Sequence, residues 1–156
     1  MKALVSTQER QESANQNPSK QNSKGALIFS QAALPLLLQT ASKPDGAKYP
    51  PTLIFTGATA SVKANAQMAS FASGKWALRA LSTSIAKEFA PKGIHVAHAI
   101  IDGVIDIPRT KEWLKDMPPE GKIGADDIAE TYWNLHTQSN RCFTNEVDIR
   151  PMLEKW

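Results

Sequence analysis

The chain contains two short β-branched runs on either side of one long helical pattern, and this order limits the possible fold more than any other feature. The first run is TLIFTGA (residues 52–58), and the second is IHVAHAII (94–101), which follows the breaker sequence APKG. Between them, apolar residues recur at spacings of three and four over residues 67–90, which predicts a helix with one buried face. A strand, a helix and a strand in this order form a right-handed crossover with parallel strands. The predicted fold class is therefore α/β, and the first strand is expected to be buried on both faces.

The segments outside this unit extend the same architecture. Residues 25–40 predict a second long helix, apolar on nearly every face, which must then be covered on several sides. Residues 125–138 predict a helix opened by an acidic pair, and residues 144–151 predict a final edge strand. Residues 1–21 are rich in Gln, Asn, Ser and Lys, a composition that predicts a disordered tail. We therefore expect one domain over residues 22–156.

Composition excludes several kinds of partner. The chain has 156 residues and a net charge of +3, but its Lys and Arg residues are dispersed, so no basic run predicts nucleic-acid binding. Its most apolar segment is shorter than the ~20 residues that cross a bilayer, so we predict no membrane span. The single cysteine, Cys142, excludes an internal disulfide and favours a reducing compartment, which predicts a cytoplasmic protein. His95 and His98 lie three apart on a predicted strand and point to opposite faces, so no metal site is predicted.

Three motifs follow one another in a fixed order: a strand ending in TGATAS, the sequence FASGK at the start of a long helix, and a strand ending in IIDGVIDIP. This order resembles the short-chain dehydrogenase/reductase family, whose Rossmann-type domain binds NAD(H) or NADP(H). The resemblance covers residues 22–156. It implies the C-terminal half of a doubly wound parallel sheet in three α/β/α layers, and an oxidoreductase that transfers hydride between small carbonyl and alcohol substrates. The specificity lies in the combination of motifs, because each motif alone is common.

The resemblance also implies which residues would act. The family uses a serine, a tyrosine, a lysine and an asparagine, and its lysine falls on Lys75. There the ammonium group would bind the nicotinamide ribose and lower the pKa of the neighbouring tyrosine. The asparagine falls on Asn22 in the sequence QNSKG. Lys75 and Asn22 are therefore the two predicted catalytic residues.

The two hydroxyl positions of the family are changed in this chain. The tyrosine position is Phe71 and the serine position is Ala58, and neither side chain can give or take a proton. Thr59 and Ser61 flank Ala58, but a shift of one residue at a strand end turns a side chain to the other face, so neither is predicted to substitute. Phe71 lies on the same helical face as Leu78, which predicts a core aromatic.

The family's Pro-Gly loop, which follows the sixth strand of the family's sheet, corresponds to Asp102 and Gly103, with Ile105 at the position whose backbone contacts the nicotinamide carboxamide. The resemblance thus implies that Lys75, Gly103 and Ile105 bind the cofactor. Asp102 and Asp106 lie in a loop beside a strand end, which favours turn-forming or solvated carboxylates over an acid/base pair.

The family's glycine-rich turn, which binds the cofactor pyrophosphate, has no counterpart among the eight glycines of this sequence. Three hypotheses remain open. The chain is a partial, atypical family member that does not turn over alone, or a noncatalytic module that forms homo- or hetero-dimers with family members through the helices predicted over 25–40 and 67–90. Alternatively, the sequence starts inside a longer gene, with residues 1 to about 21 replacing the N-terminal half. The sequence does not determine the substrate or the choice between NAD and NADP.

Overall fold

The protein folds around a small parallel sheet. The structure is a computed structural model that describes residues 18–43 and 47–155, with side chains from residue 23 onward. The three strands β1 (Thr52–Thr56), β2 (His95–Ile101) and β5 (Glu146–Ile149) lie in the order β1-β2-β5, and both pairs are parallel. The predicted parallel crossover is confirmed, and β5 is the predicted final edge strand, shorter than the 144–151 expected.

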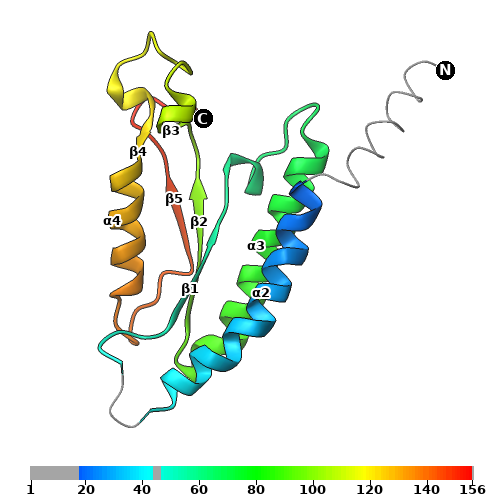
Figure 1. The fold of residues 1–156 in the computed structure, drawn as a ribbon, viewed down its shortest axis with the longest axis vertical. Coiled ribbons are helices and arrows are strands. Elements are labelled where there is room, and N and C mark those ends of the chain that lie inside the picture. Colours follow the sequence, from blue (N-terminus) through cyan, green and yellow to red (C-terminus); the bar gives the residue numbers. More distant parts are fainter. Residues whose placement is uncertain (1–17, 44–46, 156) are drawn as a thin grey trace, which may run out of the picture.

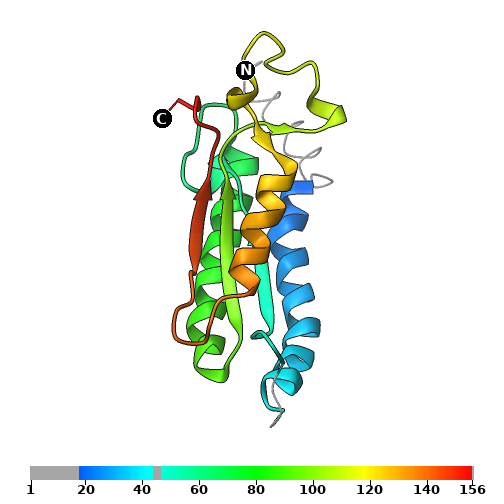
Figure 2. The ribbon, with the colours of Figure 1, turned by 90° about the vertical axis from the view of Figure 1, so that its left-hand side faces the viewer.

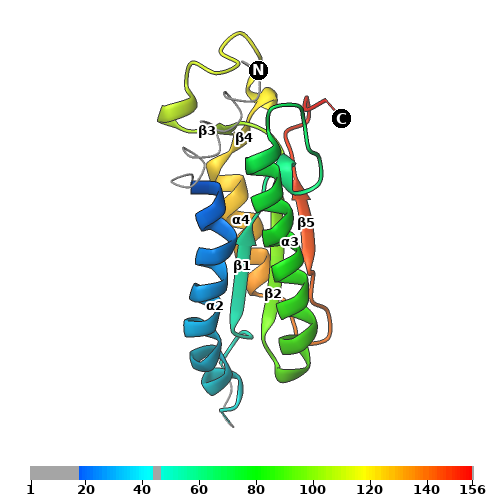
Figure 3. The same cartoon turned by 90° about the vertical axis from the view of Figure 1, so that its right-hand side faces the viewer.

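Helices cover both faces of this sheet. Helices α2 (Pro18–Ala41) and α3 (Ala69–Phe89) lie side by side on one face, and α4 (Ala125–His136) lies on the other (Figures 1, 2 and 3). The molecule is therefore a three-layer α/β/α structure, as predicted. None of the helices in the described residues is both long and apolar enough to span a bilayer.

Helix α2 begins earlier than the sequence predicts. It starts at Pro18 instead of Gly25, so residues 18–21 of the predicted tail belong to the helix, whereas residues 1–17 of that tail lie outside the described residues. Proline suits the first turn of a helix, because its fixed φ is helical and its missing N–H would have no partner there. The first turns of α2 are polar, so the pattern of hydrophobic residues gave no sign of this start.

Helix α2 is also less covered than its composition predicts. Ser30 and Leu34 are buried, but Phe29 is 61% exposed and Leu36 is 63% exposed. The expectation that the helix is covered on several sides is therefore wrong for the described residues. Helix α2 packs against α3, and Leu34 joins the core with residues of the sheet, but these contacts leave Phe29 and Leu36 uncovered (Figure 3). An apolar face of α2 is left in contact with solvent.

The hydrophobic core lies between the helix pair and the sheet. It consists of Leu34, Leu53, Phe55, Leu78, Ile85, Ala86, Ile94 and Val96. Strand β2 is buried along its whole length, but β1 buries only alternate residues, since Leu53 and Phe55 are buried and Thr56 is exposed. The prediction that β1 is buried on both faces is wrong, because its second face, which carries Thr52, Ile54 and Thr56 and lies toward α4, is only half-buried or exposed.

After β2 the chain forms a second, very small sheet. Strands β3 (Ile105–Asp106) and β4 (Ile123–Gly124) pair in parallel and enclose two short 3-10 turns, Pro108–Thr110 and Pro119–Gly121. The sequence did not predict this sheet, because strands of two residues carry no periodic pattern.

Candidate functional site

The candidate site lies at the carboxyl ends of the parallel strands, the edge at which open α/β sheets bind ligands. Two hydrogen bonds join the segments that leave β1 and β2 there. The backbone N–H of Gly57 donates to the carbonyl of Ala99 at 2.6 Å, and the hydroxyl of Thr59 donates to Oδ1 of Asp102 at 2.5 Å. The two strand ends are thus held in a fixed relation.

Lys75 reaches this edge from the second turn of α3. Its Nζ donates to the carbonyl oxygen of Thr56, the last residue of β1, at 2.9 Å, and lies 5.9 Å from the ring centroid of Phe71. Burial lowers the pKa of Lys75 from its ordinary value. The ammonium group is therefore placed at the strand end, where a cationic side chain can meet a ligand.

Phe71 does not lie in the core. Its side chain is 36% exposed, so the prediction of a core aromatic is wrong. Lys75 already lies level with the last residue of β1, and Phe71 is one turn closer to the start of α3, beyond the strand end. The apolar spacing of α3 continues to Phe71, but no strand lies beneath this turn of the helix.

The turn after β1 satisfies its hydroxyl groups internally. The backbone N–H of Ala58 donates to Oγ of Ser61 at 3.1 Å, and Ser61 is fully buried. The Thr59 hydroxyl binds Asp102. Neither Thr59 nor Ser61 occupies the position of Ala58, whose own side chain carries no polar group.

Asp102 is buried, contrary to the expectation of a turn-forming or solvated carboxylate. It is 7% exposed, and its second oxygen, Oδ2, lies 3.0 Å from Nη2 of Arg150, the residue after β5. A buried carboxylate is tolerated only with such partners, and Thr59 and Arg150 supply them. Asp106 is exposed, and its carboxylate lies 3.6 Å from Nζ of Lys122.

The other three predicted site residues lie in separate segments of the chain. Gly103 has a φ of 154°, and a Cβ there would lie 2.7 Å from Cδ of Pro151, so its backbone packs against the C-terminal segment. Ile105 lies in β3, where its carbonyl accepts the Thr110 hydroxyl. Asn22 lies in α2, outside the part whose side chains are described.

A network that sequence reasoning missed lies beside Lys75. Arg79 donates from Nη2 and Nε to the two carboxylate oxygens of Glu146, at 2.6 and 2.7 Å, and Oε2 of Glu146 also lies 3.0 Å from Nδ1 of His98. The hydrogen bond from Arg79 lowers the pKa of Glu146, and burial lowers the pKa of His98. The only signal in the sequence was the position of Arg79 one turn after Lys75, because Glu146 lies far along the chain.

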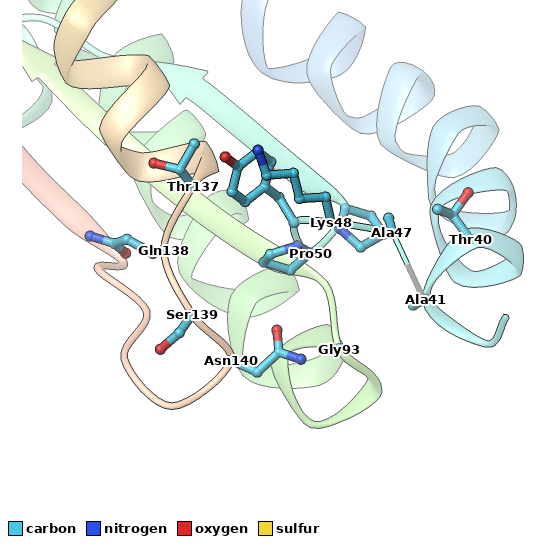
Figure 4. Close-up of a pocket in the computed structure, with 12 residues that line it drawn as sticks. Thr40, Ala41, Ala47, Lys48, Pro50, Gly93, Thr137, Gln138, Ser139 and Asn140 are labelled. Atoms are coloured by element: carbon cyan, nitrogen blue, oxygen red, sulfur yellow. The ribbon is translucent and has the colours of Figure 1, made fainter. Parts of the chain in front are cut away.

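A hollow also lies at the opposite end of the molecule (Figure 4). It is lined by residues that precede β1 and β2 or follow α4, among them Lys48, Pro50, Gly93, Ser139 and Asn140. These residues lie at the amino ends of the strands. Because open α/β sheets bind ligands at the carboxyl ends, this hollow is not the candidate site.

Comparison with known families gives a match over most of the chain. The family model described as short chain dehydrogenase matches residues 1–118. A search of curated proteins found no match.

Solved structures share the fold. A short-chain dehydrogenase from Rhodopseudomonas palustris is 35% identical, with a TM-score of 0.52, and the match covers 76% of this chain and 42% of that one. Serine dehydrogenase from Escherichia coli is 17% identical, with a TM-score of 0.66 and coverages of 86% and 52%. A 3-ketoacyl-(acyl-carrier-protein) reductase from Brucella melitensis, complexed with NADH, is 18% identical, with a TM-score of 0.67 and coverages of 84% and 54%. The chain thus spans about half the length of the solved chains it matches.

Proposed function

The chain belongs to the short chain dehydrogenase family, and from this we propose that it carries the lysine-bearing part of a nicotinamide-cofactor site in a cytoplasmic oxidoreductase. The reaction class is hydride transfer between a small carbonyl compound and an alcohol. The observation that carries the proposal is the position of Lys75, which holds its ammonium group at the carboxyl end of β1.

The residues at this edge fit the nicotinamide-ribose end of such a cofactor. The Lys75 ammonium can donate three hydrogen bonds. One of them goes to the carbonyl of Thr56, so two remain for ribose hydroxyls. The backbones of Gly103 and Ile105 are proposed as further contacts with the cofactor, and Asn22 is proposed as the second catalytic residue. When bound, the cofactor supplies or accepts the hydride.

The proton-transfer part of the site is altered. Phe71 has no hydroxyl to exchange a proton with the substrate, and Ala58 has none to polarise a carbonyl. Such acid/base catalysis is typically worth 10²–10⁴-fold in rate. We therefore propose that Lys75 binds and orients, and that this chain does not turn over by itself.

The role of Lys75 can be tested by cofactor binding. We expect Lys75→Met to weaken binding of NADH and NADPH at least tenfold, on the order of the loss of one charge-assisted hydrogen bond. The measurement is calorimetric titration of the purified chain. Lys87→Met is the matched control, because Lys87 is exposed near the other end of α3. Equal affinities for the two variants, or no binding to the unmodified chain, would contradict the proposal.

A second function is favoured by the exposed apolar face of α2. Phe29 and Leu36 are both more than half exposed and lie two helical turns apart, so they share one face of the helix. An exposed apolar patch of this kind marks an interaction site, and a second copy of the chain can present the same patch about a two-fold axis. The alternative proposal is a noncatalytic module that dimerises through α2 and α3.

Dimerisation can be measured directly. We expect the chain to elute as a dimer in size-exclusion chromatography with light scattering, and the double variant Phe29→Glu, Leu36→Glu to elute as a monomer with an unchanged circular dichroism spectrum. Met152→Glu is the control, since Met152 is exposed but lies near the C-terminus, away from α2. A monomeric unmodified chain would exclude this function.

A further inference from the structure

Strand β1 has an open edge. Within the described residues it pairs only with β2. The N–H of Gly57, just after the strand, donates to the carbonyl of Ala99 in β2. Because the backbone groups of successive residues in a strand point to opposite sides of it, the N–H and C=O groups that point away from β2 are those of Thr52, Ile54 and Thr56. Such an edge is a template for a further strand.

The last of these groups already has a partner. The Lys75 ammonium donates to the carbonyl of Thr56 at 2.9 Å, which agrees with a carbonyl that points away from β2. Thr52 and Ile54, by contrast, are half-buried residues inside the strand. Backbone groups with little access to water are almost always hydrogen-bonded. The edge beside Thr52 and Ile54 is therefore where a further strand would pair.

Helix α2 stands in the same relation to β1 as α3 does to β2. Both helices lie on one face of the sheet, run from the carboxyl ends of the strands to their amino ends, and lead into the next strand (Figure 3). Helix α3 connects two neighbouring parallel strands, so a strand before α2 would complete a second unit of this kind. Crossovers of this type are right-handed, and the two helices share one face, so that strand would lie beside β1 on the side away from β2.

The core-facing side of α2 is covered over only part of its length. Leu27 and Leu34 are seven residues apart and so lie on the same side of the helix. Leu34 is buried in the core, but Leu27, which is nearer the carboxyl ends of the strands, is 43% exposed. A strand beside β1 would bring apolar side chains to this uncovered part of the helix.

We propose that residues 3–7 of this chain, ALVST, pair with the open edge of β1 as a parallel strand. The segment has three consecutive apolar residues and includes a valine and a threonine, which are favoured in strands. Its five residues equal the length of β1. Residues 8–17 are polar except for one alanine, and lead to the start of α2 at Pro18. Connections between a strand and a helix commonly take two to six residues, so these ten are long enough.

The tether favours this segment over a strand from a second copy of the chain. A short flexible connection gives its segment an effective concentration on the order of millimolar at the edge, which a free copy does not reach in dilute solution. The polar composition that predicts a disordered tail is then the composition of the connection. This inference does not depend on the proposed cofactor site.

The test is amide hydrogen exchange of the full ¹⁵N-labelled chain, followed by nuclear magnetic resonance without cofactor. The Ile54 amide should be protected, and Val5→Pro should speed its exchange at least about tenfold, because proline cannot donate to a ladder and weakens the added strand. Gln11→Pro is the matched control, since residue 11 lies in the connection, and should leave Ile54 unchanged. The Phe55 amide, which points to β2, should stay protected in both variants and reports that the sheet is intact.

Two outcomes would overturn the proposal. One is an Ile54 amide that exchanges equally fast in the unmodified chain and in Val5→Pro. The other is restored protection of Ile54 when unlabelled, unmodified chain is added to labelled Val5→Pro, which would assign the strand to a second copy. If Val5→Pro also exposes Phe55 and so does not fold, Val5→Gly weakens the strand more mildly and should give a smaller rise at Ile54 alone.

Discussion

Gly57→Ala is expected to lower the free energy of unfolding by about 3 kcal/mol, the upper end of the usual cost of overpacking. The added methyl group would lie 2.5 Å from Nε2 of His98 and 2.8 Å from Oγ of Ser61. Both neighbours are fully buried, and His98 is held from behind by Glu146. Neither can move aside without breaking a hydrogen bond, so the strain is shared by the turn and by β2.

The matched control changes the same residue type in an open place. Nothing lies within 4 Å of a Cβ added at Gly25, which is in the exposed part of α2. Gly25→Ala should therefore raise the free energy of unfolding by up to about 1 kcal/mol, since alanine is the better helix former. Urea denaturation followed by circular dichroism measures both. Equal effects would show that the contact at Gly57 is relieved by a shift of its neighbours.

The central part of the fold could be predicted because its signals are local. The β-branched runs of β1 and β2 and the spacing of Leu78 and Ile85 in α3 each indicate one element, and their order alone requires parallel strands. The degree of burial could not be predicted in the same way. The apolar character of α2 indicates a surface available for burial, but it does not indicate whether another element covers that surface, and Phe29 and Leu36 remain exposed.

The candidate site shows the same difference between what local signals predict and what depends on distant parts of the chain. Lys75 was predicted from its place in a sequence motif, and its ammonium group lies at the carboxyl end of β1. The groups around it are joined by partners far apart in the chain, such as Thr59 with Asp102 and Arg79 with Glu146. No spacing in the sequence reports such pairs, because they depend on the register between β1, β2 and β5. The buried state of Asp102 follows from those partners and was therefore missed.

Glu146→Ala is expected to lower the free energy of unfolding by about 2 kcal/mol. Glu146 is the acceptor for both Arg79 and His98, so the change leaves two donors without partners. It also removes the ion pair that joins α3 to β5. The side chains of Arg79 and Glu146 are each 34% exposed, which places the cost between that of a buried pair, 3–5 kcal/mol, and that of an exposed one, about 0–1 kcal/mol. Asp106→Ala is the control, because Asp106 is 64% exposed opposite Lys122, and should change stability by less than about 0.5 kcal/mol.

The same substitution should change how stability depends on pH. The pKa of Glu146 is lowered in the folded chain, so the unfolded chain binds more protons just below the ordinary carboxyl pKa of 4.5, and stability falls as the pH drops through that range. The pKa of His98 is lowered from 6.5 in the folded chain as well. As the pH falls, stability therefore begins to decrease already below about pH 6.5, before Glu146 is protonated. Glu146→Ala removes the lower step, and it also removes the hydrogen bond by which Glu146 favours protonation of His98. Its upper step should therefore become larger, because the pKa of His98 falls further below that of the unfolded chain. The urea denaturation midpoints of the unmodified chain and of Glu146→Ala, measured from pH 4 to pH 8, test this prediction. If the two midpoints depend on pH in the same way, Glu146 does not interact with His98.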